Sequence, residues 1–455
     1  MKQRVTIVLP IEIKKREFDS RLLLAYFFVK EGYNIIIGDR DGCERESIYT
    51  LNCVYIAKSL AYSQKNMYNN FHNNNGKVLI LYEEGGFVGR VKTKLSEIES
   101  AYPSGMLPFI DSILIYGESY KELLIENIIG LNKTNVFSSG NSRFDLHKPK
   151  YHSYFNEDLN KIKKRYGKYI LFNGNFVTGN HFLGQDTFKN EIAENQEMND
   201  EMKSAFFERM KDAEKNIITF IEMIIIVSKA FPDLSIIVRP HPGEDGKIYH
   251  DYLSQFKNVH ITNKGNAYSW IIGAEIVIHQ DCTTGIEAVF AEKPVISYIP
   301  FSDRSNLFFL ATFLSDIATN SFEIIIKIES YLNGKKYTLN DEQKKVLEKE
   351  AINYKYYTNE LMLDIVENAV QTIELNNCNK LTLINYFKLQ YQRSRACIRW
   401  IKGKYYSNSR YSVAYEGVKK HEILKRLNII KKIENGNNVN ITVSKRGINT
   451  FHLKN

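Results

Sequence analysis

Short apolar segments alternate with segments of helical pattern along most of this 455-residue chain, and this alternation most limits the possible folds. Residues 5–9, 33–38 and 77–81 are nearly continuous apolar runs. Strands of this kind are buried on both faces, which is typical of a parallel sheet covered by helices on both sides. Further strands are predicted at 53–57, 113–116 and 136–138. We therefore expect a doubly wound α/β unit in the first part of the chain.

The same alternation restarts after a polar and charged segment at 147–165, where we place a linker between domains. A long helix is predicted at 201–230 and a shorter one at 283–290. Strands are predicted at 169–172, 235–238, 259–261, 276–279 and 295–298. The stretch 180–200 lacks clear periodicity and is expected to be a surface loop, whereas 340–375 has a helical pattern.

Two such units in series predict two Rossmann-like domains facing a cleft, followed by an extension. The predicted parts are an N-terminal domain at 1–150, a second domain at 151–378, and a basic, aromatic extension at 379–455. In open α/β sheets, ligands bind beyond the carboxyl ends of the strands. We therefore look for chemistry in the residues that follow each strand.

Cysteine content and hydropathy indicate the compartment. The five cysteines are an odd number without a Cys-x-x-Cys pair, which favours a reducing environment over a disulfide framework or a zinc site. The N-terminal segment resembles a strand rather than a signal peptide, and no run of about 18 apolar residues predicts a membrane span. We expect a cytoplasmic protein.

Positive charge is concentrated at the end of the chain. From Leu381 onward, 16 Lys and Arg stand against 3 Asp and Glu, so this part carries a net charge of +13, whereas the whole chain carries +9. We expect peripheral contact with an anionic inner membrane rather than nucleic-acid binding, with a solvated packing domain as the alternative. The residues singled out are Arg393, Arg395, Arg399, Trp400, Lys402, Lys404, Tyr405 and Tyr406.

Charged residues follow the first two predicted strands. Lys14, Arg16 and Glu17 either begin a solvated helix or line the cleft and bind an anionic or hydroxyl-rich acceptor. Asp39 and Asp41 could form a paired-carboxylate metal site, but a polar loop bracketed by glycines explains them as well. We assign no metal.

An acidic pair, Glu83 and Glu84, follows the strand at 77–81, and Gly85 and Gly86 come next. Adjacent carboxylates raise one pKa of the pair, which suits a general base that deprotonates an acceptor hydroxyl. The glycines allow close approach of the acceptor. The alternative is an acidic surface loop. Arg143, in the turn at 140–145, is predicted to border the acceptor site or to pair within that turn.

The second domain carries the most informative segment, Arg239-Pro240-His241-Pro242, at the end of a buried strand. The prolines hold the histidine rigidly, and we predict that His241 and Arg239 stabilise charge on a departing nucleotide phosphate, with Pro242 at the donor site. Asn173, at the end of the strand at 169–172, is predicted to lie at the same donor site.

Thr283, Thr284 and Gly285 begin a helix after the strand at 276–279. Their hydroxyls and the exposed N–H groups of a helix start could cradle phosphate. Glu287, one turn along, could bind ribose hydroxyls. The alternative is ordinary helix capping.

These motifs together resemble those of bacterial surface carbohydrate biosynthesis proteins, which are glycosyltransferases of the GT-B architecture. The resembling segments are 10–24, 83–86, 140–145, 239–242 and 283–298, in order across about 300 residues. An acidic pair, a His-Pro motif and a paired-hydroxyl motif are also similar to those of polysialyltransferases and Kdo transferases, and CDP-glycerol glycerophosphotransferases share the His-Pro element.

The resemblance implies roles for individual residues. Glu83 or Glu84 would be the base, His241 would contact the cytidine nucleotide, and Thr283 and Thr284 would bind its phosphate. Threonines here replace the commoner serines, and Asp281 places a negative charge close to them. A cytidine donor is therefore less well supported than a nucleotide-sugar donor in general.

The resulting expectation is a metal-independent glycosyltransferase without a cofactor. It would move a sugar from a nucleotide-activated donor, such as a CMP-activated nonulosonate or Kdo, to a glycan or lipid-linked acceptor of capsule or lipopolysaccharide. The alternatives are a UDP-sugar transferase or sugar-nucleotide epimerase, a polyol-phosphate transferase using a CDP donor, and a non-catalytic glycan-assembly protein.

Overall fold

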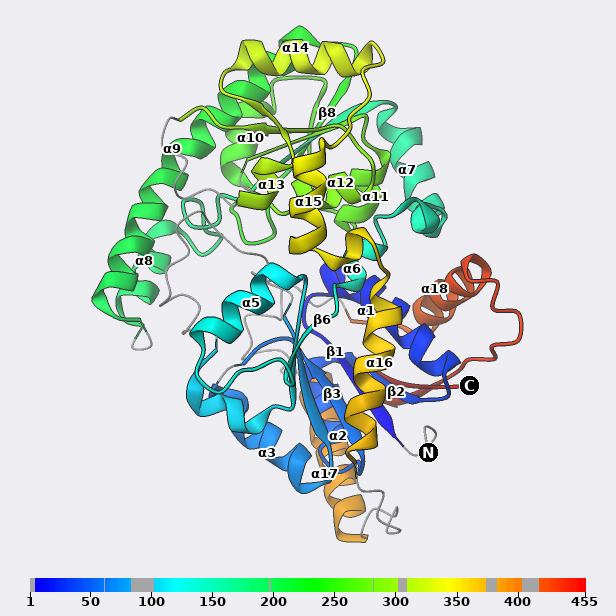
Figure 1. The fold of residues 1–455 in the computed structure, drawn as a ribbon. Helices are drawn as coiled ribbons and strands as arrows, with labels where there is room; N and C mark the ends of the chain where they lie inside the picture. Colours follow the sequence, from blue (N-terminus) through cyan, green and yellow to red (C-terminus); the bar gives the residue numbers. More distant parts are fainter. Residues whose placement is uncertain are drawn as a thin grey trace. The chain divides into compact units, whose positions relative to one another are not determined.

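A computed structural model describes residues 5–60, 62–82, 102–195, 198–280, 282–301, 309–373, 383–402 and 417–455. They form two compact units (Figure 1). Unit 1 consists of the described residues up to Leu146 and from Lys345 onward, and unit 2 of those from His147 to Lys344. Each unit has its own sheet, so the predicted α/β class with two doubly wound units is confirmed.

The sheet of unit 1 has eight strands in the order β13-β14-β2-β1-β3-β4-β5-β6. The strands from β1 to β6 pair in parallel, and their side chains are almost entirely buried because helices cover both faces. The strands are β1 (Thr6–Ile11), β2 (Asn34–Asp39), β3 (Cys53–Ala57), β4 (Lys77–Leu81), β5 (Ser112–Ile115), β6 (Val136–Ser138), β13 (Thr442–Gly447) and β14 (Thr450–Lys454).

The helices of unit 1 come from both ends of the chain. The longer ones are α1 (Lys14–Lys30), α2 (Arg40–Ser47), α3 (Lys65–Asn73), α5 (Glu118–Asn127), α16 (Thr358–Gln371), α17 (Leu383–Ile401) and α18 (Lys420–Ile433). Short helical segments are η2 (Tyr62–Gln64), η3 (Ser104–Phe109), α6 (Ser142–Asp145) and η5 (Ile352–Tyr354). The chain passes from unit 2 back to unit 1 within α15 (Asp341–Glu350).

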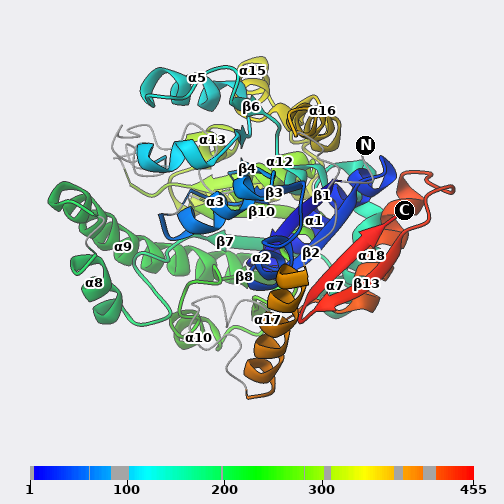
Figure 2. The same ribbon diagram turned by 90° about the horizontal axis from the view of Figure 1, so that it is seen from below.

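The last residues complete the sheet of unit 1 rather than forming a separate extension from 379. Strand β14 pairs antiparallel with β2, and β13 pairs antiparallel with β14 (Figure 2). Gly38 permits this pairing, because a Cβ there would lie 2.1 Å from the carbonyl oxygen of Asn449. The predicted boundaries at 378 and 379 therefore differ from the structure, in which the described residues from Lys345 onward belong to unit 1.

Asn353 links the two segments of unit 1, the one that ends at Leu146 and the one that begins at Lys345. Its Oδ1 accepts from Asn141 N at 2.7 Å, and its Nδ2 lies 2.6 Å from Asp145 Oδ1 and 2.7 Å from Thr358 Oγ1. The other oxygen of Asp145 accepts from Thr358 N at 2.7 Å. All four residues are buried, so these bonds hold α6 and the start of α16 together.

The sheet of unit 2 has six parallel strands in the order β12-β11-β10-β7-β8-β9. They are β7 (Tyr169–Gly174), β8 (Ser235–Arg239), β9 (Val259–Ile261), β10 (Ile276–Gln280), β11 (Val295–Tyr298) and β12 (Asp316–Ala318). The helical segments are η4 (Pro149–Phe155), α7 (Asn156–Tyr166), α8 (Gln185–Ala193), α9 (Asp200–Ala230), α10 (Lys247–Leu253), α11 (Ala267–Gly273), α12 (Thr284–Phe290), α13 (Phe309–Phe313) and α14 (Ser321–Leu332).

Three local expectations were wrong. The predicted linker at 147–165 is helical and belongs to unit 2, as η4 and α7. The predicted loop at 180–200 contains α8, although none of the side chains of α8 is buried. The loop expected around Asp39 is the start of α2, where Asp39 Oδ1 accepts from Gly42 N at 2.9 Å and caps the helix.

Among the helices in the described ranges, none combines the length and apolar content needed to cross a bilayer.

We predict that Asn353→Ala lowers the stability of unit 1 by about 3 kcal/mol, because it leaves buried partners on Asn141, Asp145 and Thr358 unpaired. Scanning calorimetry would show the transition of unit 1 at a lower temperature. Asn437→Ala, an exposed position in the same unit, is the matched control and should leave the transition in place. Equal shifts for the two variants would contradict the role of Asn353.

Candidate functional site

The strand order of unit 2 reverses at β7, and this is where an open α/β sheet forms a ligand crevice. From β7 the chain moves outward through β8 and β9, then crosses to β10 on the other side of β7. Asn173 at the end of β7 is in register with Arg239 of β8 and with His279 of β10. The carboxyl ends of β8, β7 and β10 therefore bring predicted and unpredicted polar residues to one edge.

Two amide side chains at this reversal point lack hydrogen-bond partners among the described residues. The Nδ2 of Asn173 is buried without a partner, and so are both Nε2 and Oε1 of Gln280. Asn173 is 5% exposed and Gln280 is 2% exposed. Buried polar groups in native proteins are nearly always paired, so unpaired amides at a strand-order reversal indicate a place for a polar ligand or water. Gln280 was not predicted, because the strand was expected to end at 279.

His241 follows β8 in the tight turn between Pro240 and Pro242. Its Nδ1 accepts a hydrogen bond from Gly243 N at 3.1 Å. A neutral imidazole that accepts at Nδ1 carries its proton on Nε2, so Nε2 is the nitrogen that can donate. Half-buried His241 thus has a defined orientation and tautomer, while Pro242 is exposed beside it.

Glu244 holds this turn in place, although no sequence motif singled it out. Its Oε1 accepts from His241 N at 3.2 Å and from Phe176 N, in the loop after β7, at 3.1 Å. Its Oε2 accepts from the Tyr249 hydroxyl at 2.7 Å. Burial raises the pKa of Glu244, and these hydrogen bonds oppose that effect. One buried carboxyl group therefore links the loops that follow two adjacent strands.

Arg239 is engaged within unit 2. Its Nη1 donates to the carbonyl oxygen of Lys264 at 2.9 Å and its Nη2 to that of Gly265 at 3.3 Å. The guanidinium also lies 5.1 Å from the ring centre of Trp270. Burial lowers the pKa of Arg239 to about 10, so it stays charged at neutral pH. Through these contacts Arg239 orders the loop after β9. Its predicted contact with a sugar donor stays a prediction.

His279 packs against the start of α12. Its Nε2 lies 2.9 Å from Ser315 Oγ, which itself donates to Ala311 O, so the histidine must be the donor to Ser315. Its Nδ1 then accepts from Cys282 N at 3.5 Å. A Cβ on Gly285 would lie 2.5 Å from His279 Nε2, so glycine is needed for this packing. Complete burial lowers the pKa of His279 to about 4.

The two predicted phosphate ligands, Thr283 and Thr284, lie at the start of α12 and are partly exposed. Thr283 is the N-cap residue, yet its side chain does not bond to the first N–H groups of the helix. The hydroxyl of Thr284 donates to Cys282 Sγ at 3.1 Å. Glu287 is buried, and its Oε2 lies 3.5 Å from His147 Nε2. Its predicted contact with ribose stays a prediction.

The predicted acceptor residues of unit 1 make contacts within that unit. Lys14 Nζ pairs with Glu422 of α18 at 3.0 Å. Glu17 is buried, accepts from Glu12 N at 2.7 Å, and pairs with Lys58 at 3.0 Å, so it stabilises the start of α1. Arg16 is partly exposed.

The remaining predicted residues of unit 1 lie in two places. Arg143, in α6, is buried, and its guanidinium lies 5.7 Å from the ring centre of Phe144. Glu83, Glu84, Gly85 and Gly86 lie outside the described residues, so the predicted base stays a prediction.

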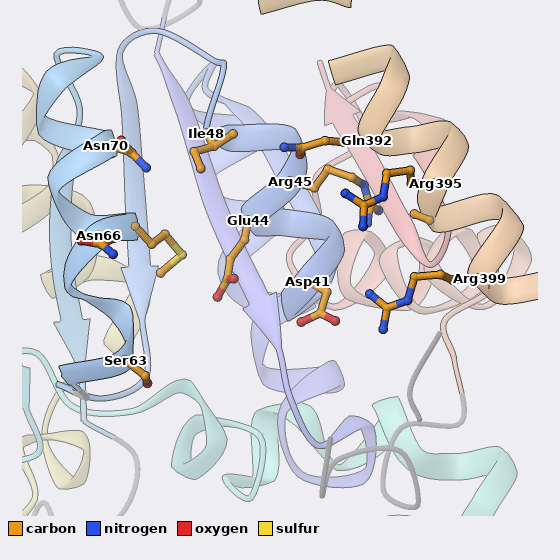
Figure 3. Close-up of a pocket in the computed structure, with 12 residues that line it drawn as sticks. Asp41, Glu44, Arg45, Ile48, Ser63, Asn66, Asn70, Gln392, Arg395 and Arg399 are labelled. Atoms are coloured by element: carbon orange, nitrogen blue, oxygen red, sulfur yellow. The ribbon is translucent and has the colours of Figure 1, made fainter. Parts of the chain in front are cut away.

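Unit 1 also has a pocket of about 540 Å³ between α2, α3 and α17 (Figure 3). Asn66 and Asn70 form one wall, and Arg395 and Arg399 point toward α2 from the other. The lining residues are Asp41, Glu44, Arg45, Ile48, Ser63, Asn66, Met67, Asn70, Gln392, Arg395, Ala396 and Arg399. No site was predicted here from the sequence.

Comparison with known proteins supports the fold. The wall teichoic acid polymerase TagF, in one of its solved forms, aligns with a TM-score of 0.50 at 9% identity, covering 82% of this chain and 90% of that one. UDP-GlcNAc 2-epimerases also align. Those from Methanocaldococcus jannaschii and Neisseria meningitidis have TM-scores of 0.49 and 0.46 at 13% and 10% identity, each covering 80% of this chain and 99% of the other. No protein-family model and no curated protein matches the sequence. The likeness to TagF shows a shared fold, of the GT-B type.

We predict that Glu244→Ala loosens the turn around His241 because three donors lose their acceptor. Amide hydrogen exchange should become faster at His241 and Phe176, and unit 2 should lose about 3 kcal/mol of stability. Glu208→Ala, at an exposed position of α9, is the matched control. Unchanged exchange at His241 in Glu244→Ala would show that the carboxyl group does not hold the turn.

We also predict that His279 makes the stability of unit 2 depend on pH. In the unfolded chain a histidine titrates near pH 6.5, whereas the folded pKa is about 4, so the unfolded state binds the proton first as pH falls. Stability is complete above about pH 6.5 and falls by about 3 kcal/mol toward pH 4. Urea unfolding of unit 2 at several pH values measures this. His279→Gln should reduce the slope, and exposed His250→Gln should not.

Proposed function

We propose that this chain is a glycosyltransferase that takes a sugar from a nucleotide-activated donor, with the nucleotide bound at the carboxyl edge of unit 2. The observation that supports it best is the group of Asn173, His241 and Gln280 on adjacent strand ends. Two of these side chains carry unpaired amide atoms, and the third has a defined donor nitrogen. Strand-order reversal is where α/β sheets bind nucleotides.

Sugar transfer from a nucleotide requires hydrogen-bond donors at the departing phosphate. The acceptor hydroxyl oxygen attacks the anomeric carbon, and the bond from that carbon to the nucleotide phosphate oxygen breaks. The phosphate leaves with the electron pair and gains negative charge. The Nε2–H of His241 donates to that oxygen, and the amides of Asn173 and Gln280 hold polar groups of the nucleotide. The acceptor proton passes to Glu83 or Glu84.

The acceptor that we propose is a hydroxyl of a bacterial surface polysaccharide, free or linked to lipid, and the donor is a CMP-activated acidic sugar. Support for both comes from the resemblance of the five motif segments to surface carbohydrate biosynthesis proteins. The donor classes that compete are UDP-sugars and CDP-polyols. They differ in the nucleotide released, which makes them separable by experiment.

We predict that His241→Ala lowers the rate of sugar transfer by about 10² to 10³, because one preorganised donor to the leaving phosphate is lost. Release of nucleotide, measured with CMP-, UDP- and CDP-activated donors, gives both the rate and the donor class. His250→Ala, at an exposed position in α10 of the same unit, is the matched control. Calorimetry of both variants checks that unit 2 stays folded.

Full activity of His241→Ala would contradict the role of this side chain. A separate measurement tests the site as a whole. The melting temperature of the intact protein should rise with one class of nucleotide, and Asn173→Ala together with Gln280→Ala should remove that rise. No response to any nucleotide would favour a non-catalytic glycan-assembly protein.

A further inference from the structure

Helix α17 presents two different faces to its surroundings. On one face Leu389 and Ala396 are 7% and 9% exposed, because α17 lies against α2 of unit 1. Gln392 Nε2 donates to the Tyr49 hydroxyl at 3.0 Å, and Arg393 Nε donates to Glu46 at 2.9 Å. Glu46 is buried, so this contact fixes how α17 is rotated about its axis.

The opposite face of α17 is apolar and exposed. Phe387, Tyr391, Ile398 and Ile401 are 66%, 64%, 52% and 73% exposed. Their spacing of four, seven and three residues places them on one stripe of a helix, about 180° from the buried face. A helix that buries one stripe against its own protein and leaves another large apolar stripe in solvent indicates an interaction surface.

A basic row runs directly beside this apolar stripe. The row consists of Lys388, Arg399 and Lys402, each of which directly follows a stripe residue, and of Arg395. Because successive residues of a helix are turned by about 100°, these side chains lie roughly 100° around the helix axis from the stripe. The sequence of residues 383–402 contains five Lys and Arg and no Asp or Glu. The apolar stripe and the basic row together match the surface of a bilayer with negatively charged head groups. At that surface the apolar side chains can reach the acyl chains while the basic side chains contact the head groups.

The position of α17 suits such a surface. One end of the helix extends beyond the other helices of unit 1 in each view (Figures 1 and 2). Arg395 and Arg399 also line the pocket between α2, α3 and α17, where Asn66 and Asn70 face them (Figure 3). This pocket of about 540 Å³ therefore has room for a phosphate head group next to the apolar stripe.

We propose that α17 lies flat on an anionic lipid bilayer, with Phe387, Tyr391, Ile398 and Ile401 inserted among the lipids and the basic row on head-group phosphates. The sequence predicted membrane contact for the whole basic extension at 379–455, whereas the proposed contact is limited to α17. Arg393 is turned inward to Glu46, and α18, β13 and β14 belong to the fold of unit 1. The proposal does not depend on the donor or on the catalytic role of His241.

The test is flotation of the full-length protein with phosphatidylcholine vesicles, with and without phosphatidylglycerol. The intact protein should float only with the anionic vesicles, and less at high salt. The triple variant Phe387→Ser, Tyr391→Ser and Ile398→Ser should lower the partition coefficient by on the order of a hundredfold. Lys388→Gln and Arg395→Gln should each lower it by about fivefold.

Matched controls separate the stripe from exposed apolar residues in general. Ile129→Ser and Phe322→Ser change side chains that are 93% and 72% exposed outside α17, and they should leave flotation unchanged. All changed apolar positions are exposed, so calorimetry should show unaltered unfolding. Retained flotation of the triple variant would overturn the proposal.

Two other occupants of the stripe are outcomes of the same experiments. If the triple variant changes the mass of the protein in sedimentation rather than its flotation, the stripe contacts a second copy. If single-stranded nucleic acid displaces the protein from vesicles and binds more tightly than they do, the basic row serves nucleic acid. Either result would overturn the membrane assignment. Nucleotide-induced stabilisation of unit 2 is measured separately, so its failure would leave this test unaffected.

Discussion

The constraint on which the structure depends is the burial of parallel strands on both faces. Strands such as β1, β4 and β7 have almost no exposed side chains, so they cannot present chemistry along their length. Polar groups are confined to the ends, and the carboxyl ends of neighbouring strands meet at one edge. Asn173, Arg239 and His279 lie together for this reason, although they are far apart in the sequence. The candidate site follows from the way the sheet is covered.

Buried polar contacts then determine which segments meet. Glu244 connects the loops after β7 and β8, and Asn353 connects the end of α6 to the returning chain. Each contact is buried, so losing a partner leaves groups that water cannot reach. Arg393 and Glu46 do the same for α17 and thereby decide which face of that helix remains exposed. The orientations of the candidate site and of α17 thus rest on a few polar pairs.

Periodicity and local motifs were enough to predict much of the fold. The strands of both units through β11, the long helix α9 and the α/β class were predicted from apolar runs and helical spacing. The His-Pro turn was predicted as rigid, and its Nδ1 contact shows how it is oriented. Glu244 and Gln280 were missed because a single buried carboxylate or amide has no pattern. The segment 180–200 was mistaken for a loop because α8 buries no side chain and so has no apolar stripe.

The sequence by itself determined the class of fold and where polar residues follow strands, because both depend on local alternation of apolar and polar residues. Only the tertiary structure decided that the end of the chain joins the first unit, because the pairing of β14 with β2 depends on the close approach at Gly38. Likewise, composition showed a basic and aromatic end, but only the docking of α17 against α2 separates its inward Arg393 from its exposed stripe. Long-range pairing of buried groups is not encoded in any local pattern.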